Sequence, residues 1–219
     1  MQPTPNWFQY AQHNFETHLA HIPTDAELDI LQIGAYTGDA SVWFTDRFPD
    51  ARLTDVDTWE GSDEPDHHNL DWRSVWSIYR TRLAGRNVTP WRMTSDQYFY
   101  FAQPHQEFDI VYVDGDHTRE QVARDAENAW NALKPGGILI FDDYTWRGHE
   151  PGNNPMDAIN PFLVAHNEEF VIVTLNTQAW IRRDEPAQVG ISLDFRPRKQ
   201  NHTDPDVADL EQPAAPAPN

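Results

Sequence analysis

Short apolar runs that each stop at glycine or aspartate constrain the fold of this chain more than any other feature. They are residues 28–33 before Gly34, 108–113 before Asp114 and 138–141 before Asp142, and a further short run, 51–56, ends at Asp57. Segments with apolar residues at helical spacing separate them, over residues 42–48, 72–83 and 122–133. Strands that alternate with helices predict a parallel sheet with right-handed crossovers. We therefore expect a doubly wound α/β fold.

Local signals sharpen the ends of this predicted fold. Thr118 and Gln121 have the spacing of a capping box, and the helix after them is expected to stop at residues 134–137, Lys-Pro-Gly-Gly. Residues 170–175 and 179–181 flank a short polar turn, which predicts an antiparallel hairpin at the sheet edge. We expect an N-terminal helical segment over 1–27, one domain over 28–195 and a disordered Pro/Ala-rich tail over 196–219.

Charge and composition exclude several classes of partner. The chain has 35 acidic and 16 basic residues, a formal net charge of -19, and no cysteine. Such a surface repels nucleic acid and anionic membranes, so neither is expected as a partner. Without thiols, disulfides, thiolate catalysis and Cys-ligated zinc are excluded. Because the N-terminus lacks the pattern of a secretion signal, a cytoplasmic location is expected; a homo-oligomer is left open.

Two glycines and an aspartate at strand ends favour a nucleoside-containing cofactor. Gly34 and Gly38 allow a tight turn at a helix N-terminus, and Asp57 can accept hydrogen bonds from a ribose diol. The spacing differs from Gly-x-Gly-x-x-Gly, in which the second glycine makes room for a pyrophosphate. A cofactor without pyrophosphate fits better. The alternative is that these glycines serve only the turn.

Several motifs taken together carry a family resemblance. They are Leu-Gln-Ile-Gly-Ala-Tyr-Thr-Gly at 31–38, Val-Asp-Thr-Trp-Glu-Gly-Ser at 56–62, Phe-Asp-Ile-Val-Tyr-Val-Asp-Gly-Asp-His at 108–117, and Leu-Lys-Pro-Gly-Gly-Ile-Leu-Ile-Phe-Asp-Asp-Tyr at 133–144. With them the chain resembles class I S-adenosylmethionine-dependent methyltransferases over about residues 28–180. Within that class it is most similar to the small-molecule O-methyltransferases of the macrocin and novobiocin sugar type.

The resemblance implies a cofactor site. Gly34 and Gly38 would line the methionine and ribose parts of S-adenosylmethionine, Asp57 would hold the ribose hydroxyls, and Ser95 and Asp96 would approach the adenine. Gln32 departs from the family, which usually has an acidic residue there, so its contact with the cofactor is expected to change. The other expected cofactor contacts are Tyr36, Thr58, Trp59 and Asp114.

Three carboxylates are candidates for a metal site. Asp114, Asp142 and Asp143 follow two strands that are expected to be neighbours, and hard oxygen ligands suit Mg²⁺ or another divalent ion. Metal-dependent relatives have this arrangement. The alternative is that these residues cap loops and begin turns, as aspartate often does.

Asp116 and His117 are the candidate catalytic bases, because either could accept the proton of a substrate hydroxyl. The family resemblance favours Asp116, and the alternative for His117 is a structural role. His67 and His68, in the acidic loop, either contact substrate or belong to a solvated loop, the reading we favour.

We therefore expect an enzyme that methylates a hydroxyl of a small-molecule acceptor from S-adenosylmethionine with divalent-metal assistance. Two alternatives remain. One is a metal-independent methyltransferase, and the other is a module of the same fold that binds the cofactor without transferring its methyl group.

Overall fold

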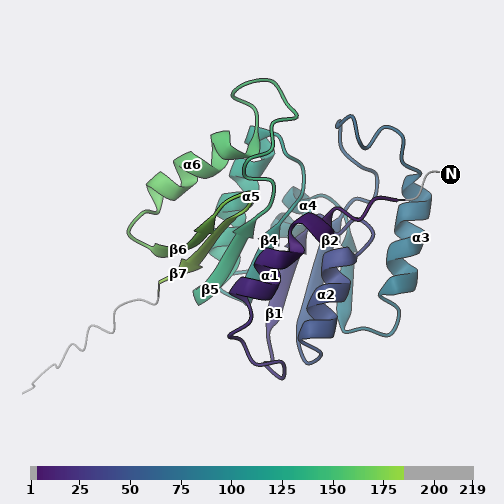
Figure 1. Cartoon of the computed structure of the whole chain (residues 1–219), viewed down its shortest axis with the longest axis horizontal. Coiled ribbons are helices and arrows are strands. Elements are labelled where there is room, and N and C mark those ends of the chain that lie inside the picture. Colours follow the sequence, from purple (N-terminus) through teal and green to yellow (C-terminus); the bar gives the residue numbers. More distant parts are fainter. Residues whose placement is uncertain (1–3, 185–219) are drawn as a thin grey trace, which may run out of the picture. The chain divides into compact units, whose positions relative to one another are not determined.

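A seven-stranded sheet organises the part of the chain that the computed structural model describes, residues 4–184 (Figure 1). Its order is β3-β2-β1-β4-β5-β7-β6. Strands β1 to β5 pair in parallel, whereas β7 runs antiparallel to both β5 and β6. The expected doubly wound α/β fold with an antiparallel edge hairpin is confirmed. The strands are β1 Asp29–Ile33, β2 Arg52–Asp57, β3 Val88–Arg92, β4 Phe108–Val113, β5 Leu133–Phe141, β6 Phe170–Leu175 and β7 Ala179–Arg183.

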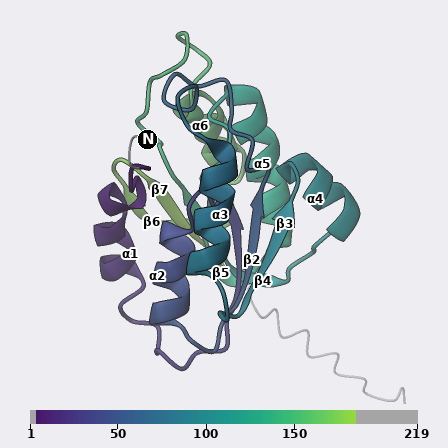
Figure 2. The same cartoon turned by 90° about the vertical axis from the view of Figure 1, so that its right-hand side faces the viewer.

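Helices cover both faces of this sheet (Figure 2). The turn η1 (Phe8–Tyr10), α1 (Gln12–His18) and α2 (Asp39–Arg47) pack on one face. Helices α4 (Ser95–Ala102), α5 (Arg119–Ala132) and α6 (Pro155–Ala165) pack on the other. Helix α3 (Trp72–Arg82) joins a third cluster with Ala35 and Trp59.

Burial on both faces explains the continuous apolar runs in the sequence. In β1, Ile30 packs with the α1 and α2 side and Leu31 with the α4 and α5 side, and neither is exposed. Successive side chains of a strand point to opposite faces, so a strand covered on both must be apolar throughout. The central strands β1, β4 and β5 largely meet this requirement, and the buried polar residue of β1, Gln32, is hydrogen-bonded.

Strand order places the ends of four parallel strands together. β1 lies between β2 and β4: the chain runs outward from β1 through β2 to β3 and then crosses back to β4 on the other side of β1. Ligands of open α/β sheets bind at such a switch point, beyond the carboxyl ends of the strands. Gly34, Asp57, Asp114 and Asp142 stand at these ends.

One boundary and two helices differ from the sequence prediction. Helix α5 ends at Ala132, and residues 134–137 belong to β5 instead of closing the helix. The pairing of β4 with β5 shifts register between Phe108 and Ile110, so the additional residues form a bulge. Helices α4 and α6 were not predicted, although Thr94 with Gln97 and Asn154 with Asp157 form capping boxes at their starts.

Outside the sheet, the N-terminal segment adds four buried residues, Phe8, Ala11, Phe15 and Leu19, to the core on the α2 face. The expected tail and the last residues of the expected domain, 185–195, lie outside the described part. Within residues 4–184, no helix is both long and apolar enough to cross a bilayer.

Candidate active site

A cavity of about 690 Å³ opens at the carboxyl ends of β1, β2, β4 and β5. Its size is within the range of small-molecule and cofactor sites. Ten of the residues expected to bind the cofactor or a metal or to act as the base line it, namely Gly34, Tyr36, Asp57, Thr58, Ser95, Asp114, Asp116, His117, Asp142 and Asp143. The strand ends therefore meet around one space, as the predicted topology required.

Two glycine-loop residues lie behind the cavity wall instead. The side chain of Gln32 is buried, with its Nε2 donating to the carbonyl of Gly34 at 3.0 Å and its Oε1 3.2 Å from the hydroxyl of Ser41. Gly38 is the N-cap of α2, with a φ of 78°. These residues support the loop on its buried side and do not line the cavity.

Trp59 and Asp96 also lie away from the cavity surface. Trp59 is 1% exposed, and its indole donates to the carbonyl of Tyr36 at 2.8 Å. Asp96 is exposed and pairs with Arg124 at 3.3 Å. Of the two residues expected near adenine, only Ser95 lines the cavity.

Gly34 brings the β1 and β4 loops into direct contact. Its φ is 83°, and a Cβ added there would lie 1.8 Å from the carbonyl oxygen of Asp114. The backbone amide of Asp114 in turn donates to the carbonyl of Ile33 at 2.8 Å. A side chain at position 34 would clash with backbone, so the approach of the two loops requires glycine.

Asp57 organises the loop that follows β1. Its Oδ2 accepts from the amides of Ala35 and Tyr36 at 2.9 and 2.8 Å, and its Oδ1 accepts from the amide of Trp59 at 2.6 Å. Burial raises the pKa of Asp57, and the three amide hydrogen bonds oppose that shift. The carboxylate lines the cavity and fixes the loop at the same time.

A second buried aspartate supports the wall on the α4 and α5 side. The side-chain amide of Gln121 donates through its Nε2 to Ser95 Oγ at 3.1 Å and to Asp125 Oδ1 at 3.1 Å. Burial raises the pKa of Asp125 to about 7. Sequence analysis treated Gln121 only as a capping residue, whereas here its side chain lines the cavity and holds Ser95.

Carboxylates crowd together at the ends of β4 and β5. The hydroxyl of Tyr112 donates to Asp142 and lies 3.1 Å from Oδ2 of Asp114. Burial, followed by the charge of Asp142, raises the pKa of Asp114 well above its usual range. Burial and neighbouring Asp143 raise the pKa of Asp142 to about 6. This end of the site therefore has an excess of negative charge.

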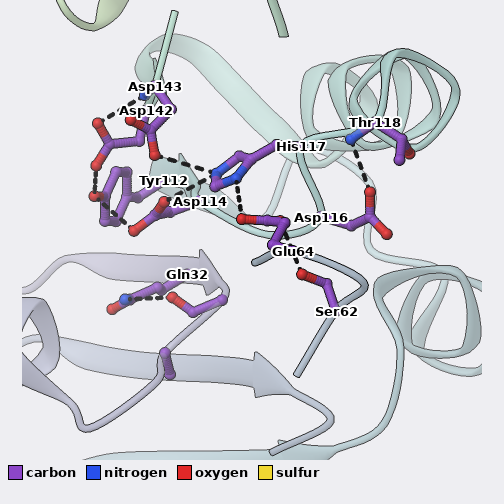
Figure 3. Close-up of polar contacts among 12 residues, drawn as sticks. Gln32, Ser62, Glu64, Tyr112, Asp114, Asp116, His117, Thr118, Asp142 and Asp143 are labelled. Carbon is purple, nitrogen blue, oxygen red and sulfur yellow. Dashed lines mark hydrogen bonds and ion pairs between the residues drawn. The ribbon is translucent and has the colours of Figure 1, made fainter. Parts of the chain in front are cut away.

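His117 lies between three carboxylates (Figure 3). Its Nε2 is 3.2 Å from Asp143 and 3.8 Å from Asp114, and its Nδ1 is 3.2 Å from Glu64. Burial opposes protonation, but the neighbouring carboxylates of Asp114, Asp143 and Glu64 raise the pKa of His117 well above its usual value. Burial by itself would raise the pKa of Glu64, but the hydrogen bond and the charge of His117 lower it to about 2. The imidazolium acts as a counter-ion for the cluster.

Metal-ligating atoms converge on the same point. One atom each from Asp114, His117 and Asp143 can be chosen so that all three lie within 4.8 Å of one another. This group differs from the predicted set, because His117 joins it and Asp142 does not. The carboxylate of Asp142 accepts instead from Tyr112 and from the amide of Asp143.

Asp116, the other candidate base, is exposed on the cavity wall. Its Oδ1 accepts from the amide of Thr118 at 2.8 Å, which fixes the carboxylate at the start of α5 (Figure 3). Its environment is more open than that of His117, whose side chain is 13% exposed.

Sequence analysis missed several residues on the cavity wall. Glu64 comes from the aperiodic loop before α3, and Trp7 comes from the N-terminal segment. Trp146 also lines the cavity, with its ring 5.0 Å from that of His117. His67 lines the cavity, whereas His68 does not and pairs with exposed Asp63 at 3.1 Å. No local pattern marked Glu64 or Trp7.

Comparison with known proteins identifies the family. A family described as a methyltransferase domain matches residues 31–144, which is more than half of the chain. The chain belongs to this methyltransferase family. The predicted enzyme class, an S-adenosylmethionine-dependent methyltransferase, is thereby confirmed. No curated protein matches the chain.

Solved structures share the fold at low sequence identity. The O-methyltransferase TomG from Streptomyces achromogenes, in complex with S-adenosylmethionine, is 19% identical with a TM-score of 0.56, covering 80% of this chain and 81% of its own. An O-methyltransferase from Bacillus cereus is 16% identical with a TM-score of 0.54, covering 84% and 83%. MycE, a mycinamycin-pathway methyltransferase with bound Mg, is 16% identical with a TM-score of 0.57; the match covers 88% of this chain but 53% of MycE.

Proposed function

We propose that this methyltransferase transfers the methyl group of S-adenosylmethionine to a hydroxyl of a small molecule, with assistance from a divalent ion. One observation carries the proposal. The Gly34 and Asp57 loops and the cluster of Asp114, His117 and Asp143 line the same cavity. A donor site and a charged reaction site thus share one space. The O-methyltransferases of similar fold support the choice of a hydroxyl.

In the cofactor half, the residues bind and orient. Asp57, already held by three amides, would accept the ribose hydroxyls through its remaining lone pairs. Ser95 would approach the adenine from the wall that Gln121 supports. Gly34, without a side chain, would let the backbone come close to the cofactor.

In the reaction half, Asp114, His117 and Asp143 would hold the divalent ion. The fit rests on their converging ligand atoms and on carboxylates whose crowding raises the pKa of Asp114. Oxygen and imidazole ligands suit Mg²⁺ or Mn²⁺ in a protein without thiols. When bound, such an ion orients a substrate hydroxyl and increases its acidity.

Asp116 would accept the proton of the substrate hydroxyl in this arrangement. The hydroxyl oxygen attacks the sulfonium methyl in line, the carbon–sulfur bond breaks, and the hydroxyl proton passes to a carboxylate oxygen of Asp116. Asp116 suits the role because it lines the cavity, stands beside the cluster and has an oxygen not engaged by Thr118. Glu64 would hold His117 through its Nδ1 and direct Nε2 toward the carboxylates.

A metal-independent enzyme is the second candidate. The observation that favours it is the set of ion pairs of His117, which neutralise part of the acidic cluster without any added ion. His117 would then be the group nearest to a substrate hydroxyl, and proximity would supply the rate enhancement.

Methyl transfer to a panel of hydroxylated sugars and catechols tests the proposal, with S-adenosylhomocysteine formation as the readout and a strong chelator in a parallel arm. We expect turnover that the chelator abolishes and Mg²⁺ or Mn²⁺ restores. Turnover that resists chelation would select the metal-independent enzyme. Tight S-adenosylhomocysteine binding without turnover of any acceptor would indicate a cofactor-binding module.

A further inference from the structure

The cavity wall is strongly and uniformly acidic. Seven carboxylates line it, and no lysine or arginine does so among the described residues. The seven are Asp57, Glu64, Asp66, Asp114, Asp116, Asp142 and Asp143. Two of them, Asp66 and Asp116, are exposed, so they act on a ligand that enters and not only on the folded core.

Arginines near the cavity do not offset this charge. Arg92 donates to the carbonyl of Thr58 at 3.2 Å, and Arg147 donates to the carbonyl of Trp146 at 2.8 Å. Neither side chain lines the cavity. Apart from the imidazole of His117, which Glu64, Asp114 and Asp143 already surround, a carboxylate or phosphate on the acceptor would find no cationic side chain to pair with and several like charges to repel it.

Aromatic rings form one side of the same cavity. Trp7, Tyr36, His67 and Trp72 come from four separate segments, and all line the space. The ring centroids of Trp7 lie 4.5 Å from Tyr36 and 5.6 Å from His67, and His67 lies 5.1 Å from Trp72. Contacts this close leave no room between the rings, so they present a continuous wall to a ligand.

Tyr36 carries an unsatisfied polar atom at this wall. Its hydroxyl oxygen is buried and has no hydrogen-bond partner. A buried hydroxyl without a partner is costly, and a polar group of a ligand would relieve that cost. The wall therefore combines ring faces, which attract cations, with a polar atom that needs a partner.

We infer that the natural acceptor is a ring-bearing molecule with two polar groups, a protonated amine and the hydroxyl that receives the methyl group. This inference rests on the proposed function. The aromatic wall contacts the ring, and the carboxylates of the cavity attract the ammonium. Anionic acceptors are rejected by the same charges.

Charge also decides which group is methylated. Surrounding carboxylates favour the protonated form of an amine, and an ammonium has no lone pair with which to attack the sulfonium methyl. The hydroxyl oxygen therefore forms the new bond to carbon, the carbon–sulfur bond breaks, and the hydroxyl proton leaves to a carboxylate. The amine keeps its proton and only positions the molecule.

Matched probes test the charge preference. The aminomethyl, hydroxymethyl and carboxymethyl derivatives of catechol share a ring and its hydroxyls and differ in charge. With the full chain saturated with S-adenosylhomocysteine and Mg²⁺, we expect calorimetry to give about ten-fold tighter binding for the amine than for the alcohol, and weaker binding still for the carboxylate. Equal binding, tighter binding of the carboxylate, or no binding of the amine would overturn the inference.

Two aspartates of one loop provide a matched pair of variants. Asp66 lines the cavity, whereas Asp63 is fully exposed in the same loop and does not. Asp66→Asn should lower the amine-to-alcohol affinity ratio about three-fold, the effect of one solvent-exposed charge, and Asp63→Asn should leave it unchanged. If Asp66→Asn and Asp63→Asn had the same amine-to-alcohol affinity ratio, the charge of the cavity would not select the acceptor.

The aromatic wall has its own test. Trp7→Ala should weaken binding of all three catechols, because it removes a ring contact and not a charge. If Trp7→Ala bound all three catechols at wild-type affinity, the aromatic wall would not contact the ring of the acceptor. S-adenosylhomocysteine affinity is measured first in every case: no binding of this product defeats the proposed function, whereas product binding without amine preference defeats only the acceptor inference.

Discussion

Asp57 and Asp114 both end strands that flank β1, yet the structure treats their charges in opposite ways. Asp57 accepts hydrogen bonds from three backbone amides of its own neighbourhood. Asp114 faces the carboxylate of Asp142, with the hydroxyl of Tyr112 at 3.1 Å and the imidazole of His117 at 3.8 Å. One carboxylate is matched by fixed dipoles, and the other stands in a cluster with excess negative charge.

The two halves of the site are therefore built differently. Fixed amides preorganise Asp57, so the cofactor half needs little rearrangement to bind. The reaction half holds carboxylates at close range with one imidazole as counter-ion, an arrangement that an added cation would stabilise. Substitutions in each half can test this contrast.

Gly34→Ala should be the most damaging change, because it strikes where the two halves touch. The new Cβ would lie 1.8 Å from the Asp114 carbonyl at a φ of 83°. We expect a loss of about 3 kcal/mol or more in the free energy of unfolding, measured by urea denaturation. Gly85→Ala is the control: its φ is also positive, 80°, but a Cβ there meets nothing within 4 Å. It should cost only about 1 kcal/mol; equal losses would mean that the contact between the loops is unimportant.

Asp57→Ala should disable the cofactor half. It removes the acceptor of three amides as well as the expected partner of the ribose, so S-adenosylhomocysteine affinity should fall about one hundred-fold. Isothermal titration calorimetry measures this loss. Asp50→Ala, at an exposed position outside the cavity, should bind as the wild type does. Near-normal affinity in Asp57→Ala would show that the preorganised carboxylate does not hold the cofactor.

Asp143→Asn and Asp142→Asn separate the observed group from the predicted three-carboxylate set. Saturating Mg²⁺ should raise the melting temperature of the wild type by about 5 °C through mass action. Asp143→Asn should lose this response, whereas Asp142→Asn should keep most of it, because Asp142 is engaged with Tyr112. A greater loss in Asp142→Asn would favour the set of Asp114, Asp142 and Asp143. No response to Mg²⁺ or Mn²⁺ in the wild type would argue against a metal.

The smallest effect concerns Asp55, beneath the glycine loop. Burial raises its pKa from 3.8 to about 7, although Ser41 and Tyr79 donate hydrogen bonds to it. Between those two pH values the folded state binds more protons than the unfolded state, so its stability falls as pH rises. Asp55→Asn should remove a difference on the order of 1 kcal/mol between pH 6 and pH 7, measured by denaturation at each pH. An unchanged pH slope in the variant would assign the fall to other groups.

Much of the fold could be predicted because local patterns encode it. The central strands β1, β4 and β5 are buried on both faces, so their sequences are mostly apolar and stop where the polar cavity begins, at Gly34, Asp114 and Asp142. The helices after them have clear apolar stripes. Helix α4 was missed although its capping box was visible in the sequence, because its aromatic residues include exposed Tyr100 and Phe101 and blur the stripe.

Contacts between distant segments could not be predicted in this way. Glu64 reaches His117 across 53 residues, and Trp7 meets Tyr36 and His67 only after the N-terminal segment packs on the sheet. Neither residue has a neighbour in sequence that signals the contact. The same holds for Asp142, which the sequence grouped with Asp143 but which accepts a hydrogen bond from Tyr112 on the neighbouring strand β4.

The sequence by itself therefore determined the parallel sheet, the glycine turn and the acidic residues at the strand ends, since periodicity and turn chemistry act over a few residues. Only the tertiary structure decided which of those acids face one another and which amides, rings and imidazole surround them. Hydrogen bonds and charge interactions act over a few ångströms in space without regard to separation along the chain, and so they are fixed when the strands pair and the loops close over the cavity.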